Sequence, residues 1–302
     1  DRGGAGAAHA DRNALRTRPL HEVGDDEEIS REVHADDDVK LELEAFPVFS
    51  AVGDAVQREA RLQAGGRGVN AIPDNLRGGS GAAYVFERAN DAWRQTTYLK
   101  GSQANRNDAL GVAIEISEDG NTIVAGVADD TCLVPGLNAP CRESTWPPQL
   151  GAGSAGAAYV WVRSGNTWIE QAFLKASNPD LEDLFGVRVA ISADGNTIVA
   201  GAPNEDSNAK GINGNQSNNL GEGAGAAYVF TRSGTTWTQR AYLKGSNTDA
   251  FDEFGSAVAM SADGKTIVIG APLEKSASKG VNANQLDNSA EGVGAAYVFT
   301  VN

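Results

Sequence analysis

Carboxylates gather just ahead of two Phe-Gly pairs, Phe185-Gly186 and Phe254-Gly255. The candidate metal ligands among them are Asp180, Asp183, Asp249 and Asp252. Calcium takes six to eight oxygen ligands, so carboxylates in this number make it the candidate cation. The aspartate two positions before each Phe-Gly pair can instead accept hydrogen bonds from backbone N–H groups and cap a turn. The spacing favours turn caps, with calcium sites as the alternative.

Two loops of about 20 residues, 204–223 and 273–292, are rich in Asn, Gly, Ser, Asp and Glu, and loops of this length usually serve a purpose. Their amide and carboxylate groups are suited to bind sugar hydroxyls, protein or calcium. The candidate ligand-binding residues are Glu205, Asp206, Asn213, Asn215, Glu274, Asn282 and Asn284. The alternative is a pair of self-bonded polar loops that only space the strands.

The cysteines, Cys132 and Cys141, lie nine positions apart in a stretch rich in Pro, Asn and Gly. Their spacing is compatible with one disulfide closing a surface loop and does not match a zinc site. Such a loop would present Trp146, an aromatic side chain that could contact carbohydrate or protein. The alternative is that Trp146 folds back over the loop as a local core.

Catalytic patterns are poorly represented in this sequence. The part after residue 66 contains no histidine, and neither a Gly-x-Ser-x-Gly elbow nor a phosphate-binding Gly-rich loop ahead of a helix is present. Asp183 and Glu205 could form the paired carboxylates of a glycan-active enzyme, but their separation does not follow from the sequence. We therefore predict a protein that is not an enzyme.

An internal repeat organises the chain. The sequence Gly-Ala-Ala-Tyr-Val begins at positions that lie 75, 69 and 69 residues apart, namely Gly81, Gly156, Gly225 and Gly294. Within one unit, residues 186–192 and 197–201 flank Asp194-Gly195, the pattern of a β-hairpin. Residues 226–230 and 237–243 supply two further strands. Each unit is predicted to be a four-stranded antiparallel sheet, and stacking into a propeller buries its apolar faces.

These units resemble the FG-GAP repeats of integrin α-subunit β-propellers and of many bacterial surface proteins, and the bacterial type is the closer match. Phe185-Gly186 with Gly201-Ala202-Pro203, and Phe254-Gly255 with Gly270-Ala271-Pro272, carry the resemblance. The resemblance implies an all-β, propeller-type fold over residues 67–302. Integrin-type repeats often hold calcium in an Asp-x-Asp-x-Asp-Gly loop, but the corresponding loops here offer one carboxylate between the strands at Asp194, or two at Glu118-Asp119. That calcium function is therefore not carried over.

The repeat boundaries predict two complete blades, at about 108–175 and 183–244, and two partial ones, at 67–101 and 252–302. A ring of seven such blades would need a longer chain. We expect that other blades or another copy complete the ring, with a four-bladed ring that uses N-terminal strands as a further option.

Residues 1–66 differ from the repeats. The segment from Glu22 to Glu44 is dense in carboxylates, and the repeat hairpin expected ahead of residue 67 is missing from the sequence pattern. We predict an acidic segment that is disordered or poorly packed, either a genuine leader or a mistranslated stretch. The whole chain of 302 residues carries a net charge of −15, which disfavours nucleic acid as a partner, and no apolar run is long enough for membrane insertion.

Together these observations predict a non-catalytic binding or adhesion module, extracellular or at the cell surface, whose polar loops meet a glycan or a protein. The competing prediction is a structural spacer of repeats stabilised by calcium. A glycan-active enzyme is the less favoured third. Apart from calcium, no cofactor is expected.

Overall fold

The computed structural model describes residues 33–35, 39–42, 67–70, 78–141 and 153–301, and its regular elements are β-strands. Within these ranges, no helix has the length and apolarity that a membrane crossing requires.

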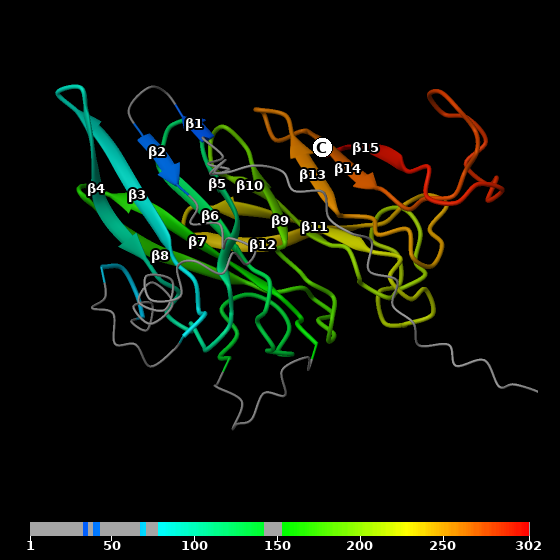
Figure 1. Cartoon of the computed structure of the whole chain (residues 1–302), viewed down its shortest axis with the longest axis horizontal. Helices are drawn as coiled ribbons and strands as arrows, with labels where there is room; N and C mark the ends of the chain where they lie inside the picture. The colour runs from blue at the N-terminus through cyan, green and yellow to red at the C-terminus, as the bar shows by residue number, and fades with distance from the viewer. Residues whose placement is uncertain (1–32, 36–38, 43–66, 71–77, 142–152, 302) are drawn as a thin grey trace, which may run out of the picture.

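The strands form four antiparallel sheets in chain order, which we call blades 1 to 4 (Figure 1). Blade 1 contains β1 (Val33–Ala35), β2 (Val39–Glu42), β3 (Ala83–Ala89) and β4 (Ala92–Leu99). Blade 2 contains β5 (Leu110–Ile116), β6 (Thr122–Val127), β7 (Ala157–Ser164) and β8 (Thr167–Leu174). Blade 3 contains β9 (Arg188–Ile191), β10 (Thr197–Ala202), β11 (Ala226–Ser233) and β12 (Thr236–Leu243). Blade 4 contains β13 (Ala257–Met260), β14 (Thr266–Ala271) and β15 (Ala295–Thr300).

The Asp-Gly turns predicted from the sequence form the hairpins at the start of the repeat blades. In blade 3, the Asp194 carboxylate accepts hydrogen bonds from the Ser192 hydroxyl (2.6 Å) and the Asn196 N–H (3.0 Å). Gly195 has a φ of 66°, a conformation that glycine adopts without steric cost. The carboxylate is therefore occupied in holding the turn, as the sequence indicated.

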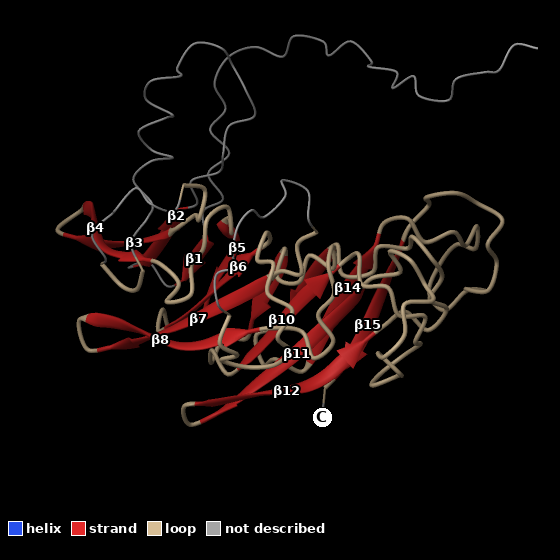
Figure 2. Cartoon of the chain, turned by 90° about the horizontal axis from the view of Figure 1, so that it is seen from below, coloured by secondary structure: helices blue, strands red, loops and turns tan. Residues whose placement is uncertain are grey.

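The blades pack face to face, and the first strands of successive blades lie next to one another, as in a propeller. The sheets follow one another along the molecule in both views, from blade 1 at one end to blade 4 at the other (Figures 1 and 2). Three hydrophobic cores lie between them. The two Phe-Gly aromatics, Phe185 and Phe254, are buried in these cores at 0% and 1% exposure. The prediction of an all-β fold of propeller-type blades is confirmed.

Blade 1 departs from the prediction. The sequence pattern predicts no hairpin ahead of residue 67, but β1 and β2 form one. β2 pairs with β3, from Val39 opposite Glu87 to Glu42 opposite Tyr84. Val39 and Leu41 alternate with charged residues, the period of a half-buried strand. So short an alternation, within a segment dense in charge, does not by itself indicate a strand. Blade 1 is thus four-stranded rather than partial, and the rest of residues 1–66 lies outside the described residues.

Candidate functional site

The long loop of blade 3, residues 204–223, is held by its own polar groups. The Asp206 carboxylate accepts a hydrogen bond from the Gly223 N–H (2.8 Å). The Asn215 side chain accepts one from the Ser217 N–H (3.0 Å). These two predicted ligand residues therefore direct their oxygens into the loop itself, as the alternative interpretation of the loop proposed.

Glu205, from the same loop, belongs to a buried ion pair. Its Oε2 lies 2.9 Å from Nζ of Lys244, the residue that follows β12, and both side chains are at most 2% exposed. Asn178 donates a second hydrogen bond to Glu205 Oε1 (2.8 Å). Burial lowers the pKa of Lys244, and the Glu205 charge opposes that shift. The carboxylate therefore anchors the end of β12, because charges this deeply buried need a partner.

Asn213 fixes the same strand through the backbone. Its N–H donates to the Tyr242 carbonyl (2.8 Å), and its side-chain oxygen accepts from the Tyr242 N–H (2.9 Å). Asn213 has a φ of 54°, in the left-handed region that asparagine tolerates better than most residues. In blade 3, then, the loop and the outer strand form one unit.

Blade 4 repeats these positions without an outer strand among the described residues. Glu274, 2% exposed, accepts hydrogen bonds from Asn247 Nδ2 (2.7 Å) and the Ser276 N–H (3.0 Å). Within the described ranges it has no ion pair. Asn282 has a φ of 52°, close to that of Asn213, but it is exposed.

A cavity of about 830 Å³ opens at this place, between the loop 273–292 and β15. Glu274 and Asn282 line it, together with Tyr297 and Val298 of β15. The structure thus brings two predicted ligand residues to one concave site. Figure 1 shows the loop, in orange to red, extending beyond β15 at the blade 4 end.

Asn284, the last candidate of this loop, does not line the cavity. Its carbonyl accepts a hydrogen bond from the Ser276 hydroxyl (2.9 Å), and its side chain accepts one from the Leu286 N–H (3.2 Å). It is occupied in the same way as Asn215 in blade 3.

Asp183 and Asp252 hold the turns ahead of the Phe-Gly pairs. Asp183 accepts a hydrogen bond from the Asp180 N–H, and Asp252 accepts one from the Asp249 N–H, both at 2.8 Å. This is the turn-cap geometry that the sequence favoured. Burial, and to a smaller degree the charges of Glu205 and Asp180, raises the pKa of Asp183 to about 8.

Each of these two carboxyl groups has a second oxygen, Oδ1, that is buried with no hydrogen-bond partner among the described residues. The other members of the pairs, Asp180 and Asp249, accept hydrogen bonds from Asn219 and Asn288 of the long loops, both at 2.6 Å. The structure therefore ties each acidic pair to a long loop.

In the part of the chain that the structure describes, these aspartates do not bring three ligand atoms within 4.8 Å of one another. The group that does so consists of Asp130, Cys132 and Cys141. Its cysteines form a disulfide and so offer no thiolate to a metal. Calcium binding stays a prediction.

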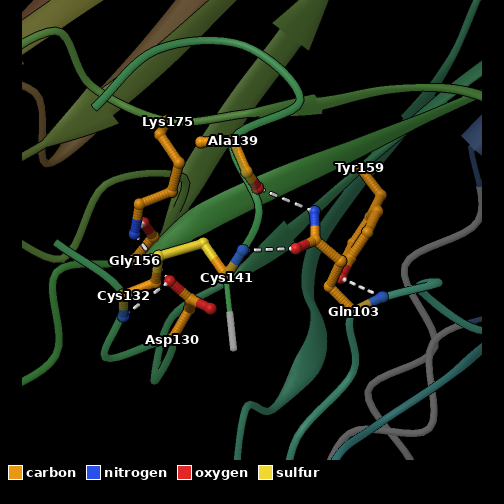
Figure 3. The surroundings of a disulfide bond; sticks show 8 residues. All are labelled: Gln103, Asp130, Cys132, Ala139, Cys141, Gly156, Tyr159 and Lys175. Carbon is orange, nitrogen blue, oxygen red and sulfur yellow. Dashed lines mark hydrogen bonds and ion pairs between the residues drawn. A yellow bond between two sulfur atoms is a disulfide. The ribbon is translucent and has the colours of Figure 1, made fainter. Parts of the chain in front are cut away.

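The predicted disulfide between Cys132 and Cys141 forms, with 5.6 Å between the Cα atoms. The N–H of Cys141 donates to the Gln103 side chain (2.6 Å) and the N–H of Cys132 donates to Asp130 (3.1 Å), as Figure 3 shows. Asp130 also pairs with buried Lys175 at 2.6 Å. The disulfide loop is thus fastened to the body of blade 2. Trp146 lies outside the described residues.

Sequence reasoning missed the buried lysines. Lys100, Lys175 and Lys244 are 0% exposed, and each follows an aromatic-Leu pair at the end of a fourth strand. The recurrence of aromatic-Leu-Lys at the same place in three units was the available signal. The recurrence alone does not predict burial, because lysine is usually a surface residue.

Comparison with known proteins agrees with the repeat pattern. Residues 168–230 and 237–299 match the family model described as FG-GAP repeat. No curated protein matches the chain. Among solved structures, the chain is similar to a "putative 6-phosphogluconolactonase" from Bacteroides uniformis, with 14% identity and a TM-score of 0.39. That similarity covers 75% of this chain and 49% of the other, about half its length, and carries no argument about function.

Each matched stretch begins in the outer strand of one blade and ends in the third strand of the next, from Trp168 in β8 to Phe230 in β11 and from Trp237 in β12 to Phe299 in β15. The sequence repeat is therefore offset from the structural blade by one strand. The two matched stretches, 168–230 and 237–299, carry FG-GAP repeats.

Proposed function

We propose that this chain is a non-catalytic binding module whose ligand site is the cavity of blade 4. The observation that carries the proposal is the cavity itself, about 830 Å³ in volume, between the loop 273–292 and β15. Concave sites of this size with a few convergent polar groups on a rigid scaffold are typical of ligand binding. Glu274 and Asn282 supply the polar groups, and Tyr297 supplies an aromatic surface.

The proposed setting is extracellular or at a bacterial cell surface, where the module would contribute to adhesion to a glycan or a protein. The disulfide between Cys132 and Cys141 supports this setting, because structural disulfides persist in oxidising compartments. The net charge of −15 supports a partner other than nucleic acid.

The test is retention on immobilised glycans, purified surface proteins and whole bacterial cells, with a variant that blocks the cavity. Val298→Glu places a charge on a cavity-lining residue that is already 69% exposed, so the fold should tolerate it. Leu220→Glu is the matched control, on the blade 3 loop and 77% exposed. We expect Val298→Glu alone to abolish retention with an unchanged thermal melt. Equal retention of both variants would argue against the cavity.

A second candidate function is a structural repeat stabilised by calcium. The buried, unpartnered Oδ1 atoms of Asp183 and Asp252 favour it, since a cation is one way to satisfy such oxygens. Thermal unfolding in calcium and in chelator distinguishes the candidates, because a ligand at 100 times its Kd stabilises by about 2.7 kcal/mol. A calcium-dependent rise in Tm that Asp183→Asn removes supports the structural role. Superimposable melts reject it.

A further inference from the structure

A lysine, a carboxylate and a side-chain amide meet in blade 3. The Glu205 carboxylate accepts a hydrogen bond from Lys244 Nζ at Oε2 (2.9 Å) and another from Asn178 Nδ2 at Oε1 (2.8 Å). Asn178 lies between β8 and β9, whereas Lys244 follows β12. One carboxylate therefore holds an amine and an amide that come from opposite ends of the blade 3 sequence.

The amide of Asn178 is fixed and polarised by its other contacts. The Tyr228 hydroxyl donates to Asn178 Oδ1 (2.7 Å), and Asn178 Nδ2 also donates to the Gln216 carbonyl (3.1 Å). Burial raises the pKa of Tyr228 well above its usual value, so its hydroxyl stays a donor. A donor placed on a carbonyl oxygen stabilises the negative charge that develops there when a nucleophile adds to the carbon.

The surroundings of Lys244 favour a neutral amine. Its side chain is 0% exposed, and Glu205 is its one hydrogen-bond acceptor within the described ranges. Lys175 of blade 2 has two, Asp130 and the Gly156 carbonyl. Because an ammonium group carries three N–H donors, burial with a single acceptor disfavours the charged form and lowers the pKa of Lys244. A desolvated lysine with a lowered pKa is a nucleophile.

We propose that the side chains of Lys244 and Asn178 become joined by an amide bond, which the folded protein forms by itself with release of ammonia. Lys244 is the nucleophile and Cγ of Asn178 is the carbon that it attacks. Glu205 transfers the protons, and Tyr228 stabilises the charge on Oδ1. The ion pair between Lys244 and Glu205 is the state before the reaction.

The atoms and protons of this step balance within the site. Glu205 takes a proton from the Lys244 ammonium, and the freed electron pair on Nζ forms a bond to Cγ of Asn178. The bond between Cγ and Nδ2 breaks, and Nδ2 leaves as ammonia with a proton that Glu205 transfers to it. Nζ keeps one hydrogen, and its other proton stays on Glu205. A buried ion pair is thus replaced by neutral groups, which removes the desolvation penalty of two charges.

The fold supplies the proximity and the dryness that such a reaction needs. Groups held side by side react as if at very high concentration. Attack requires Nζ to move from the carboxylate to the amide carbon, which the flexible stem of lysine permits. Glu205 and Tyr228 are at most 1% exposed, so the site largely excludes water.

Blade 2 contains the lysine and the carboxylate without the amide. Lys175 pairs with Asp130, but Gln103, which occupies the place of Asn178 in the repeat, directs its side chain to the disulfide loop (Figure 3). Its side-chain carbonyl accepts a hydrogen bond from the Cys141 N–H (2.6 Å). Blade 2 is therefore an internal control, and Lys175 should keep a free amine.

The bond would close the chain around blade 3, because it joins the segment after β8 to the residue after β12. Like a disulfide, it would stabilise the protein by restricting the unfolded chain, but a reducing agent would not break it. Its formation does not depend on the cavity of blade 4.

Mass spectrometry of the purified wild-type chain, denatured and reduced, tests the bond. The intact mass should be lower than that of the sequence by one ammonia. Trypsin should release residues 176–188 and 241–265 as one branched peptide, because it does not cleave after a linked Lys244. Fragmentation should place the branch at Asn178. The branch is the deciding observation, since succinimide formation at Asn213-Gly214 would also release ammonia.

Asn178→Ala removes the carbon that is attacked, so it should restore the full mass and separate the two peptides. Asn219→Ala is the matched control, because the Asn219 amide also donates to a carboxylate, that of Asp180 (2.6 Å), and its loss should leave the branch intact. Asn178 is half-buried, so the chain should fold without its amide.

Tyr228→Phe keeps the ring and removes the donor to Asn178 Oδ1. It should slow formation of the bond about a hundredfold, as for loss of one donor to a developing oxyanion. The measurement is the unlinked fraction of protein harvested at intervals after synthesis. A merely structural role of the hydroxyl would not change this fraction.

A wild-type chain with its full mass, and with residues 176–188 and 245–265 as separate tryptic peptides, overturns the inference. A branch that joins Lys244 to Glu205, or one that persists in Asn178→Ala, also overturns it.

Discussion

Blades 3 and 4 contain the same repeat, yet the same residues meet different surroundings in each. Val229 of β11 is 0% exposed, because blade 4 packs over it, whereas Val298 at the same place on β15 is 69% exposed. Glu205 has Lys244 as its partner, whereas Glu274 has no ion pair in the described residues. A repeat thus encodes both sides of an interface, and the neighbour decides whether a residue serves stability or is left available for binding.

The largest expected effect on the free energy of unfolding comes from removal of Lys244, the buried lysine that pairs with Glu205 in blade 3. Lys244→Met leaves Glu205 buried without its cation, and breaking such a pair costs about 3 to 5 kcal/mol. Chemical denaturation measures the loss in the free energy of unfolding. Lys210→Met, at an exposed lysine of the blade 3 loop, is the control and should change it little. A loss below about 1 kcal/mol for Lys244→Met would contradict the anchoring role.

The next largest expected effect on stability comes from the disulfide between Cys132 and Cys141, which blade 2 has and blade 3 lacks. A bond that closes so short a loop stabilises by roughly 2 to 3 kcal/mol through chain entropy. The double variant Cys132→Ser, Cys141→Ser should lose about that amount in chemical denaturation. Reducing agent should lower the Tm of the wild-type chain and leave the variant unchanged. If both melts respond equally to the reductant, the bond is not the source of the stability.

Val229 and Val298 occupy the same position of the repeat but differ in exposure, so the same substitution should destabilise the protein by different amounts at the two sites. Val229→Ala opens a cavity between blades 3 and 4 and should cost about 2 kcal/mol. Val298→Ala should cost less than about 0.5 kcal/mol, as expected for a surface position. The two substitutions are chemically identical and serve as each other's control. Equal losses would mean that the outer face of blade 4 is covered in solution.

The repeats made most of the fold predictable from the sequence. Gly-Ala-Ala-Tyr-Val placed a strand in each of the four units, and the Asp-Gly turns placed hairpins in blades 2 to 4, since both patterns encode local backbone geometry. The two N-terminal strands were not predicted, because Val39 and Leu41 form too short an alternation to outweigh the surrounding charge.

The candidate site was predicted only in part, because its parts meet across long sequence separations. Glu274 and Asn282 were chosen as polar loop residues, and they do line the cavity. Asp206 and Asn215 fit the same description but bond within their own loop. The composition of a loop does not show which of its polar residues line a cavity and which bond within the loop. The aromatic-Leu-Lys recurrence would have helped, because it shows which acidic residue has a lysine partner.

The stability of the chain should also depend on pH, and to a different degree at the two Phe-Gly turns. The pKa of Asp183 is raised to about 8 by burial, whereas the unfolded chain releases this proton near pH 4. Between those values the folded state binds more protons than the unfolded state, so the free energy of unfolding falls as pH rises. The wild-type chain should therefore be less stable at pH 8 than at pH 5.

Asp183→Asn removes the titrating group and should reduce that fall, as measured by chemical denaturation at both pH values. Burial also raises the pKa of Asp252, but the nearby charge of Lys275 opposes the shift, so Asp252→Asn should reduce the fall less. Asp108, whose pKa burial raises to about 7, titrates in the same window and should keep part of the slope in both variants. An identical slope in the wild type and in Asp183→Asn would show that Asp183 is ionised in the folded protein. Its unpartnered oxygen would then carry a full charge, which would make the calcium experiment decisive for this turn.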